Sequence, residues 1–378
     1  MIPPARDTKV TRQPKSVTRF DWCKGYYEYP GLIIEVGETY ALTPSCVNEC
    51  PAAFLFALAN GDVVVGSRAC MKDNEDIVGM GAWPTWKHSI NAGKTRFAGA
   101  KGSWENMPPW PSYSACQLPD GEIVSLGRSH LRETDRPGTY TLRVYRSTDD
   151  GHTHQGETAT MVDLPKLHPD RTWVDHSVAI LQDGTLLAAL QGCFENDVKT
   201  RTFVMRSRDR GGTWQYLSTV AFDLDPGTDR RMDGFCEPYL LVLSSGEILC
   251  FMRSGGTYNA TFTPLYLSRS IDDGQSWSHA DEIADRGVWP NACRMANGIL
   301  AVAYGRPGDW LAFSIDEGHH WIGHFNFYHG PQSLDAANYN WVEEVAPDIL
   351  LVAYSRTDFE DIRQSEILGT YLRVRRES

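Results

Sequence analysis

Six short segments carry most of the residues that could do chemistry, and each stands directly before an apolar run. Together they offer carboxylates, an imidazole, amides and aromatic rings. Aromatic rings stack on the apolar faces of sugars, while carboxylates and amides bind hydroxyl groups. The sequence therefore indicates a saccharide-binding surface, formed by Glu49, Tyr113, Asp175, His176, Glu237, Trp289, Asn291 and the segment 338–341.

Asp175 and His176 are adjacent in the chain, which argues against a catalytic dyad. Successive side chains of a strand point to opposite faces, so the carboxylate would not orient its neighbour's imidazole. His176 alone remains a candidate base.

The apolar runs come in pairs joined by tight turns. "FALANGDVVV" and "AILQDGTLLA" place Asn-Gly and Asp-Gly between two apolar stretches, which is a strong hairpin signal. Such turns fall near positions 61, 121, 184, 246, 298 and 348, at intervals of 50–63 residues. This period, without a long helical pattern, predicts an all-β fold of six four-stranded sheets: a six-bladed β-propeller.

A second pattern, Ser-x-Asp-x-Gly-x-(Thr/Ser)-Trp, recurs between the hairpins. It begins at Ser147, Ser207, Ser270 and Ser314, with a degenerate copy at Ser89. The glycine permits a left-handed turn, the aspartate accepts main-chain N–H bonds, and the tryptophan packs beneath the hairpin. We interpret the pattern as a structural staple of each sheet.

The last repeat needs strands from both ends of the chain. "GTYLRVRR" from Gly369 is predicted as its third strand and "GLIIEV" from Gly31 as its fourth. The sequence thus predicts one domain over 1–378, closed by N- and C-terminal strands in one blade, with 1–30 as an extension packed on or near it. Such closure removes exposed sheet edges.

The composition and net charge of the chain disfavour several classes of function. A net charge of −12 disfavours nucleic acid and anionic membranes as partners, and no apolar run approaches a membrane span. The polar N-terminus predicts a cytoplasmic protein, or a secreted or periplasmic one if a signal was removed. The nine cysteines include no C-x-x-C pair, which favours reduced, buried thiols. No zinc-ligand spacing, P-loop or dinucleotide-binding glycine motif is present in the sequence, so no metal or cofactor is expected. A Cys46–Cys50 bridge or metal site stays an open alternative.

The repeated pattern resembles that of the Asp-box, or BNR-repeat, proteins of the sialidase superfamily, over about residues 45 to 375. The resemblance implies a tyrosine nucleophile activated by a glutamate, because the substrate's own carboxylate would repel an anionic nucleophile. On this basis Tyr339 is the nucleophile and Glu237 its base. Arg253 and Arg306 match two of the family's three arginines that clamp the substrate carboxylate.

The acid/base and the first clamp residue are less well matched. The resemblance places the acid/base in the loop "MKDNEDIVGM", where Asp76 is preferred over Asp73 and Glu75. Where the family has its first clamp arginine, this chain has Glu49, which reverses the charge. Either Arg68 or Arg128 replaces that arginine, or the substrate is not an ordinary sialoside.

Three functions remain open from the sequence. The first is an exo-acting glycoside hydrolase acting on a sialic acid-like terminal sugar. The second is a polysaccharide lyase, in which His176 or Tyr339 takes a proton beside a uronate; its unsaturated product absorbs ultraviolet light. The third is a non-catalytic propeller that binds glycans. The oligomeric state is not predicted.

Overall fold

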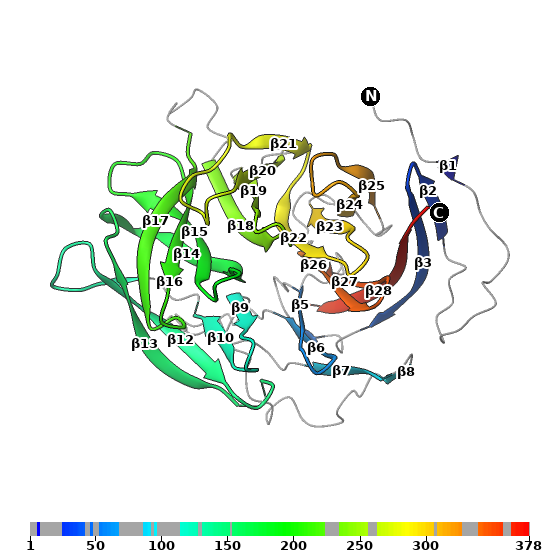
Figure 1. The fold of residues 1–378 in the computed structure, drawn as a ribbon, viewed down its shortest axis with the longest axis horizontal. Helices are drawn as coiled ribbons and strands as arrows, with labels where there is room; N and C mark the ends of the chain where they lie inside the picture. Colours follow the sequence, from blue (N-terminus) through cyan, green and yellow to red (C-terminus); the bar gives the residue numbers. More distant parts are fainter. Residues whose placement is uncertain are drawn as a thin grey trace. The chain divides into compact units, whose positions relative to one another are not determined.

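The computed structural model describes residues 6–7, 25–41, 46–47, 53–67, 86–91, 94–96, 114–127, 131–151, 153–223, 234–255, 263–305, 308–326, 339–357 and 364–377. All regular structure in these ranges is β-strand (Figure 1). No helix in them is long and apolar enough to cross a membrane.

Within the described ranges, the strands form six groups of four, which we call repeats 1 to 6. Strands in each group are neighbours in one sheet and follow the chain, except that repeat 6 takes its fourth strand from the N-terminal part. Repeat 1 comprises β5 (Ala53–Ala57), β6 (Asp62–Ser67), β7 (Trp86–Asn91) and β8 (Lys94–Arg96). Repeat 2 comprises β9 (Ser114–Gln117), β10 (Ile123–Leu126), β12 (Tyr140–Ser147) and β13 (Gln155–Val162), with β11 (Arg132–Glu133) paired to β12.

The next three repeats have the same organisation. Repeat 3 comprises β14 (Leu167–Ile180), β15 (Leu186–Phe194), β16 (Arg201–Ser207) and β17 (Thr213–Ala221). Repeat 4 comprises β18 (Gly234–Val242), β19 (Ile248–Gly255), β20 (Leu265–Ser270) and β21 (Asp281–Ala284). Repeat 5 comprises β22 (Val288–Arg294), β23 (Leu300–Gly305), β24 (Asp309–Ser314) and β25 (Ile322–Asn326).

Repeat 6 confirms the predicted use of both ends of the chain. It comprises β26 (Asn340–Ala346), β27 (Ile349–Thr357), β28 (Gln364–Arg376) and β3 (Leu32–Ala41). The register pairs Val374 with Ile34, so β28 lies beside β3 in Figure 1. The sheet continues through β2 (Gly25–Tyr29) to β1 (Arg6–Asp7), and β4 (Cys46–Val47) also pairs with β28.

Repeats 2 and 3 are joined in one sheet, which the sequence did not predict. Their outer strands β13 and β17 pair in parallel, with Thr160 opposite Thr213 and Met161 opposite Trp214 (Figure 1). The N–H of Thr160 also donates to the carbonyl of Gly212, at 3.2 Å. The last residues of the Asp box in repeat 3, Thr213 and Trp214, therefore form part of the β-ladder that joins repeats 2 and 3.

The hairpin turns have the geometry that their sequences predict. Five glycines occupy the left-handed region, with φ between 81° and 93°: Gly61, Gly121, Gly184, Gly246 and Gly298. Repeat 6 has Asp348 in this position, with φ of 63°. Aspartate tolerates this conformation better than most residues, so the sixth hairpin forms without a glycine.

The Asp boxes act as staples, as predicted. In repeat 3, the hydroxyl of Ser207 accepts the N–H of Gly211 at 2.8 Å, and Asp209 accepts the N–H of Thr213 at 2.8 Å. The indole of Trp214 is fully buried and donates to the carbonyl of Gly211. The same serine-to-glycine bond occurs in the boxes that begin at Ser147, Ser270 and Ser314.

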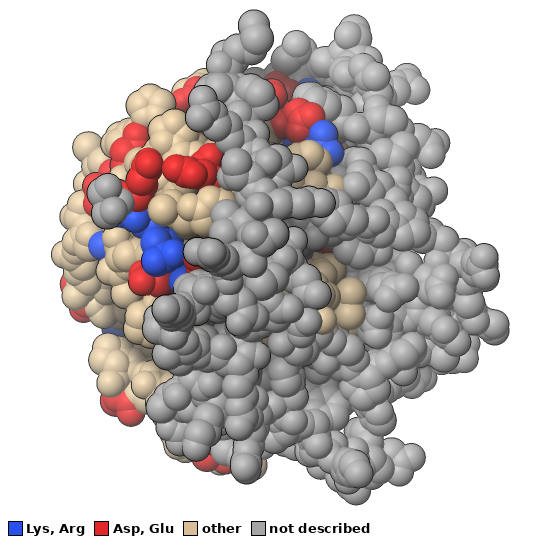
Figure 2. All heavy atoms as spheres, turned by 90° about the vertical axis from the view of Figure 1, so that its right-hand side faces the viewer, with Lys and Arg blue, Asp and Glu red and all other residues tan. Residues whose placement is uncertain are grey.

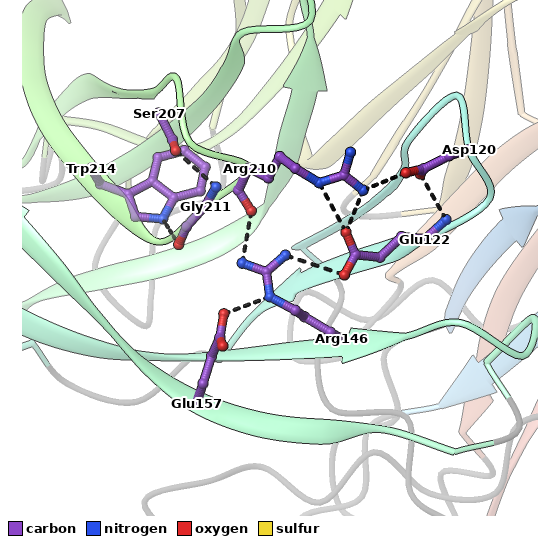
Figure 3. A network of polar contacts seen from close by, with 8 residues as sticks. All are labelled: Asp120, Glu122, Arg146, Glu157, Ser207, Arg210, Gly211 and Trp214. Atoms are coloured by element: carbon purple, nitrogen blue, oxygen red, sulfur yellow. Dashed lines mark hydrogen bonds and ion pairs between the residues drawn. The ribbon is translucent and has the colours of Figure 1, made fainter.

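Figure 3 shows how the Asp box of repeat 3 contacts the hairpin turn of repeat 2. The guanidinium of Arg210 donates to Asp120 at 2.8 Å and to Glu122 at 2.6 Å. Arg146 on β12 donates to the carbonyl of Arg210 and pairs with Glu122 and Glu157. The ion pairs of Arg210 connect segments that are 88 to 90 residues apart in the chain.

The strands gather into two compact units. One contains the described parts of 1–70, 83–107 and 291–378, and the other those of 108–290. Each has its own apolar core: Leu32, Phe313 and Val352 belong to the first, and Val144, Leu190 and Trp214 to the second. The single domain over 1–378 stays a prediction.

Surface charge is mixed where it can be seen. On the face drawn in Figure 2, the lysines and arginines of the described residues lie beside aspartates and glutamates. These residues form no continuous basic surface on that face.

Candidate active site

Glu237 stands at a break in the inner strand of repeat 4. The pairing of β18 with β19 shifts between Cys236 and Tyr239, so Glu237 lies in a β-bulge with φ of 51°. Its N–H leaves the ladder and donates to Oε1 of Gln191 at 2.7 Å. Bulges redirect a side chain and are common beside active sites. The residue is only 6% exposed, so its carboxylate needs internal partners.

Arg253 and the main chain of Trp289 supply these partners. Nε and Nη2 of Arg253 donate to the two carboxylate oxygens of Glu237 at 2.6 and 2.9 Å. The N–H of Trp289 donates to Oε2 at 2.7 Å. The hairpin register places Arg253 opposite Cys236, directly beside Glu237. A bidentate guanidinium and a main-chain donor fix both the position and the plane of the carboxylate.

Four predicted site residues share one structural position. Asp175, Glu237, Trp289 and Tyr339 each stand nine residues before the left-handed residue of their hairpin turn. Trp289 has φ of 54°, close to the value at Glu237, and the pairing of β14 shifts around Asp175 and His176. The side chains of these last two residues lie outside the described part of the structure. The four residues thus share their spacing from the turn, and Glu237 and Trp289 also share a positive φ.

Tyr339 is half-buried, and the main chain that follows it is held firmly. The amide of Asn291, fully buried on β22, donates to the carbonyl of Asn340 at 2.6 Å and accepts the N–H of Val342 at 2.7 Å. Nδ2 of Asn340 donates to the carbonyl of Tyr304 at 2.9 Å. These bonds give Asn291 a role in supporting the strand that carries Tyr339. They do not test its predicted contact with substrate.

The structure adds residues that the sequence reasoning missed. Gln191 is a lone amide in the apolar strand "LLAALQGCF", and this polar exception was the available signal. Asp309 is fully buried and accepts Nδ2 of Asn340 at 3.3 Å. Neither partner could be identified from spacing alone, because each bond joins two repeats.

Several predicted residues cannot be placed. Glu49, Arg68, Asp76, Tyr113 and Arg306 lie outside the described residues, as do Asp73, Glu75 and Arg128. Trp289 is placed with its side chain buried, and its N–H bonds to Glu237. The pairing of Tyr339 with Glu237 stays a prediction.

Residues 118–355 match the model of the BNR repeat-like domain, which is more than half of the chain. The chain therefore belongs to this family, within the sialidase superfamily, and the repeats are blades of a sialidase-type six-bladed β-propeller. The predicted family and fold class are confirmed.

Three solved structures illustrate this fold. A protein of unknown function from Dyadobacter fermentans is 17% identical, with a TM-score of 0.61, over 92% of this chain and 100% of its own. The GH93 α-L-arabinofuranosidase of Fusarium graminearum, solved with arabinobiose, is 14% identical, with a TM-score of 0.60, over 89% and 98%. The Trypanosoma rangeli sialidase, solved with the inhibitor DANA, is 13% identical, with a TM-score of 0.54, over 98% and 60%. Curated protein sequences give no significant match.

Proposed function

We propose that the protein is an exo-acting glycoside hydrolase that removes a sialic acid-like terminal sugar. The observation that carries the proposal is the buried carboxylate of Glu237, directed by a bulge and fixed by Arg253 and Trp289. Tyr339 occupies the equivalent position in repeat 6. An oriented carboxylate and a phenol from equivalent positions of two repeats suit a nucleophile and its base.

The proposed reaction has two steps. The phenol oxygen of Tyr339 attacks the anomeric carbon, its proton passes to Glu237, and Asp76 protonates the departing glycosidic oxygen. Asp76 then takes a proton from water, whose oxygen attacks the anomeric carbon, and Tyr339 leaves and regains its proton from Glu237. The configuration at the anomeric carbon is retained, because it is inverted twice.

The geometry favours a positioning role for Arg253. Nε and Nη2 both donate to Glu237, so this guanidinium orients the base. Binding of the substrate carboxylate then depends mainly on Arg306, with Arg68 or Arg128 opposing the charge of Glu49.

Substitution of Tyr339 tests the mechanism. Tyr339→Phe removes the attacking oxygen, so kcat on an aryl sialoside should fall by at least about 100-fold. Tyr26→Phe, on β2, is the matched control and should leave kcat unchanged. Turnover of Tyr339→Phe near that of the unmodified protein would refute the nucleophile assignment.

A neutral sugar is the second candidate substrate. Glu49 replaces a clamp arginine and Arg253 is engaged by Glu237, which weakens the case for a substrate carboxylate. A neutral substrate would not repel an anionic nucleophile, so Glu237 itself could attack. In that case an aryl α-L-arabinofuranoside is hydrolysed faster than a sialoside, Glu237→Gln is inactive, and Tyr339→Phe retains activity.

A further inference from the structure

Gln191 is a polar residue at an apolar position of repeat 3. It lies on β15, where Leu187 and Ala189 point to one face of the sheet and belong to the core shared with β18 and β19. Gln191 continues this row, because every second residue of a strand faces the same side. Its side chain therefore faces repeat 4. Burying an amide in such a row costs free energy unless both of its ends find partners.

The oxygen end of this amide is engaged, and its nitrogen end is open to a ligand. Oε1 accepts the N–H of Glu237 at 2.7 Å, which fixes the side chain against β18. Nε2 has no acceptor among the described residues, and it is not one of the side-chain atoms there that are both unpaired and sealed from solvent. The two N–H donors of Nε2 therefore reach solvent, although only 9% of the residue is exposed.

Two cross-strand neighbours show which groups accompany Gln191. Trp173 on β14 and Thr202 on β16 stand directly opposite it, and directly opposite residues share a face of the sheet. Oγ1 of Thr202 donates to the carbonyl of Phe235 at 3.3 Å, which shows independently that this face turns toward β18. Trp173 is half-buried, so part of its surface stays accessible beside Gln191.

The chemistry of these groups indicates which ligand they suit. The amide nitrogen of Gln191 only donates, so its partner must carry an acceptor oxygen. The indole of Trp173 can pack on the apolar face of a sugar, and a sugar carries acceptor oxygens around that face. Neither side chain is charged, so the pair selects a ligand by shape and hydrogen bonding and not by its charge.

We infer that Gln191 and Trp173 form a sugar subsite beside Glu237. Nε2 of Gln191 donates to an oxygen of the bound sugar, and Trp173 packs on the sugar's apolar face. The inference rests on the proposed function in one respect, because it takes Glu237 as the base.

The same amide connects this subsite to the proposed base. Oε1 of Gln191 holds the N–H of Glu237 in the bulge that directs the carboxylate. A sugar bound to Nε2 restrains the amide further, and therefore also the bulge. One side chain thus contacts the substrate and positions the base.

Nuclear magnetic resonance on the full chain tests the contact directly. The probes are the sialidase inhibitor DANA and the neutral sugar methyl α-L-arabinofuranoside. The side-chain amide signal of Gln191, identified by its loss in Gln191→Glu, should shift on titration with at least one probe. A glutamine that only supports the fold would keep its signal unchanged.

Substitutions separate the two ends of the amide. Gln191→Glu keeps an acceptor for the N–H of Glu237 but removes the donors, so affinity for the bound probe should fall by roughly 3- to 10-fold. Gln191→Met also lacks the donors, is uncharged, and should weaken binding by a similar factor. Trp173→Ala removes the ring and should weaken binding as well.

Gln182→Glu is the matched control. Gln182 lies in the hairpin turn of the same repeat, where its Nε2 donates to the carbonyl of Ser244 in repeat 4 at 3.0 Å. The control makes the same chemical change in an exposed turn and should leave affinity for both probes unchanged.

The outcomes separate this inference from the proposed function. Binding that depends on Gln191, without turnover of any glycoside, would contradict the hydrolase assignment alone. Turnover with the same KM in Gln191→Met and the unmodified protein would overturn the subsite alone. An unshifted amide signal at saturating probe, weakening by Gln191→Glu but not by Gln191→Met, or binding of neither probe would also overturn the subsite.

Discussion

The candidate site depends on single residues in strained backbone positions. Glu237 and Trp289 both have positive φ without being glycine, and each makes a hydrogen bond that keeps it there. Such conformations cost about 1–3 kcal/mol and persist only where surrounding bonds hold them. The positive φ that Glu237 and Trp289 share at equivalent positions is consistent with the proposed role of the inner-strand starts in the site.

At the residue scale, Glu343 on β26 makes stability depend on pH. Burial raises the pKa of Glu343 to about 7, although the indole N–H of Trp341 donates to its carboxylate. The unfolded chain ionises this group near pH 4.5, while the folded chain keeps the proton until about pH 7. Stability should therefore fall as pH rises through this window.

Glu343→Gln removes the ionisable group, and with it the free-energy cost of ionising a buried carboxyl group in the folded chain. The melting temperature of the variant, relative to the unmodified protein, should be higher at pH 8 than at pH 5. Glu282→Gln, at an exposed position on β21, is the control and should show no such difference. Equal effects of Glu343→Gln at both pH values would contradict the raised pKa.

At the scale of elements, hydrogen bonds between neighbouring repeats recur at equivalent positions of the inner strands. Ser177 accepts the N–H of Leu240 at 2.7 Å, and Asn291 accepts the N–H of Val342 at 2.7 Å. Each acceptor stands seven residues before the glycine of its hairpin turn. One polar side chain thus links the inner strand of its repeat to the inner strand of the next.

Removing one staple hydroxyl measures what an Asp box contributes. Ser207→Ala leaves the buried N–H of Gly211 without its acceptor, so the free energy of unfolding should fall by about 1–3 kcal/mol. Urea titration followed by tryptophan fluorescence reports this change. Ser276→Ala removes an exposed hydroxyl of another box and should change it by less than about 0.5 kcal/mol.

The sequence predicted the elements better than it predicted the site. Hairpins and staples depend on residues a few positions apart, such as Ser207 and Gly211, so their patterns are visible locally. The β13–β17 ladder and the bond from Gln191 to Glu237 join different repeats, and only the packed structure brings those partners together. Glu237 and Arg253 were both predicted, but their mutual ion pair was not.

At the scale of the whole molecule, the reactivity of the buried cysteines can show whether the two units unfold together. The five whose side chains the structure describes are buried thiols, as the sequence predicted: Cys116, Cys193, Cys236, Cys250 and Cys293. Burial raises the pKa of the thiols of Cys116, Cys193, Cys250 and Cys293, so little reactive thiolate is present near neutral pH. Cys293 belongs to the unit containing 291–378, and the other four belong to the unit containing 108–290.

Alkylation in mild denaturant, resolved by peptide mass spectrometry, distinguishes one folding unit from two. A single domain over 1–378 should expose all five thiols at one common rate. Faster labelling of Cys293 than of Cys116 and Cys250, or the reverse, would show that the two units open separately.

The pairing of β3 with β28 has a consequence for biosynthesis. Residues 32–41 leave the ribosome long before residues 364–376, and at about 5–20 residues per second the interval is roughly 20–60 s. During that time an early, apolar strand has no native neighbour on one side. Nascent chains should therefore depend on chaperones that shield this strand until translation is nearly finished.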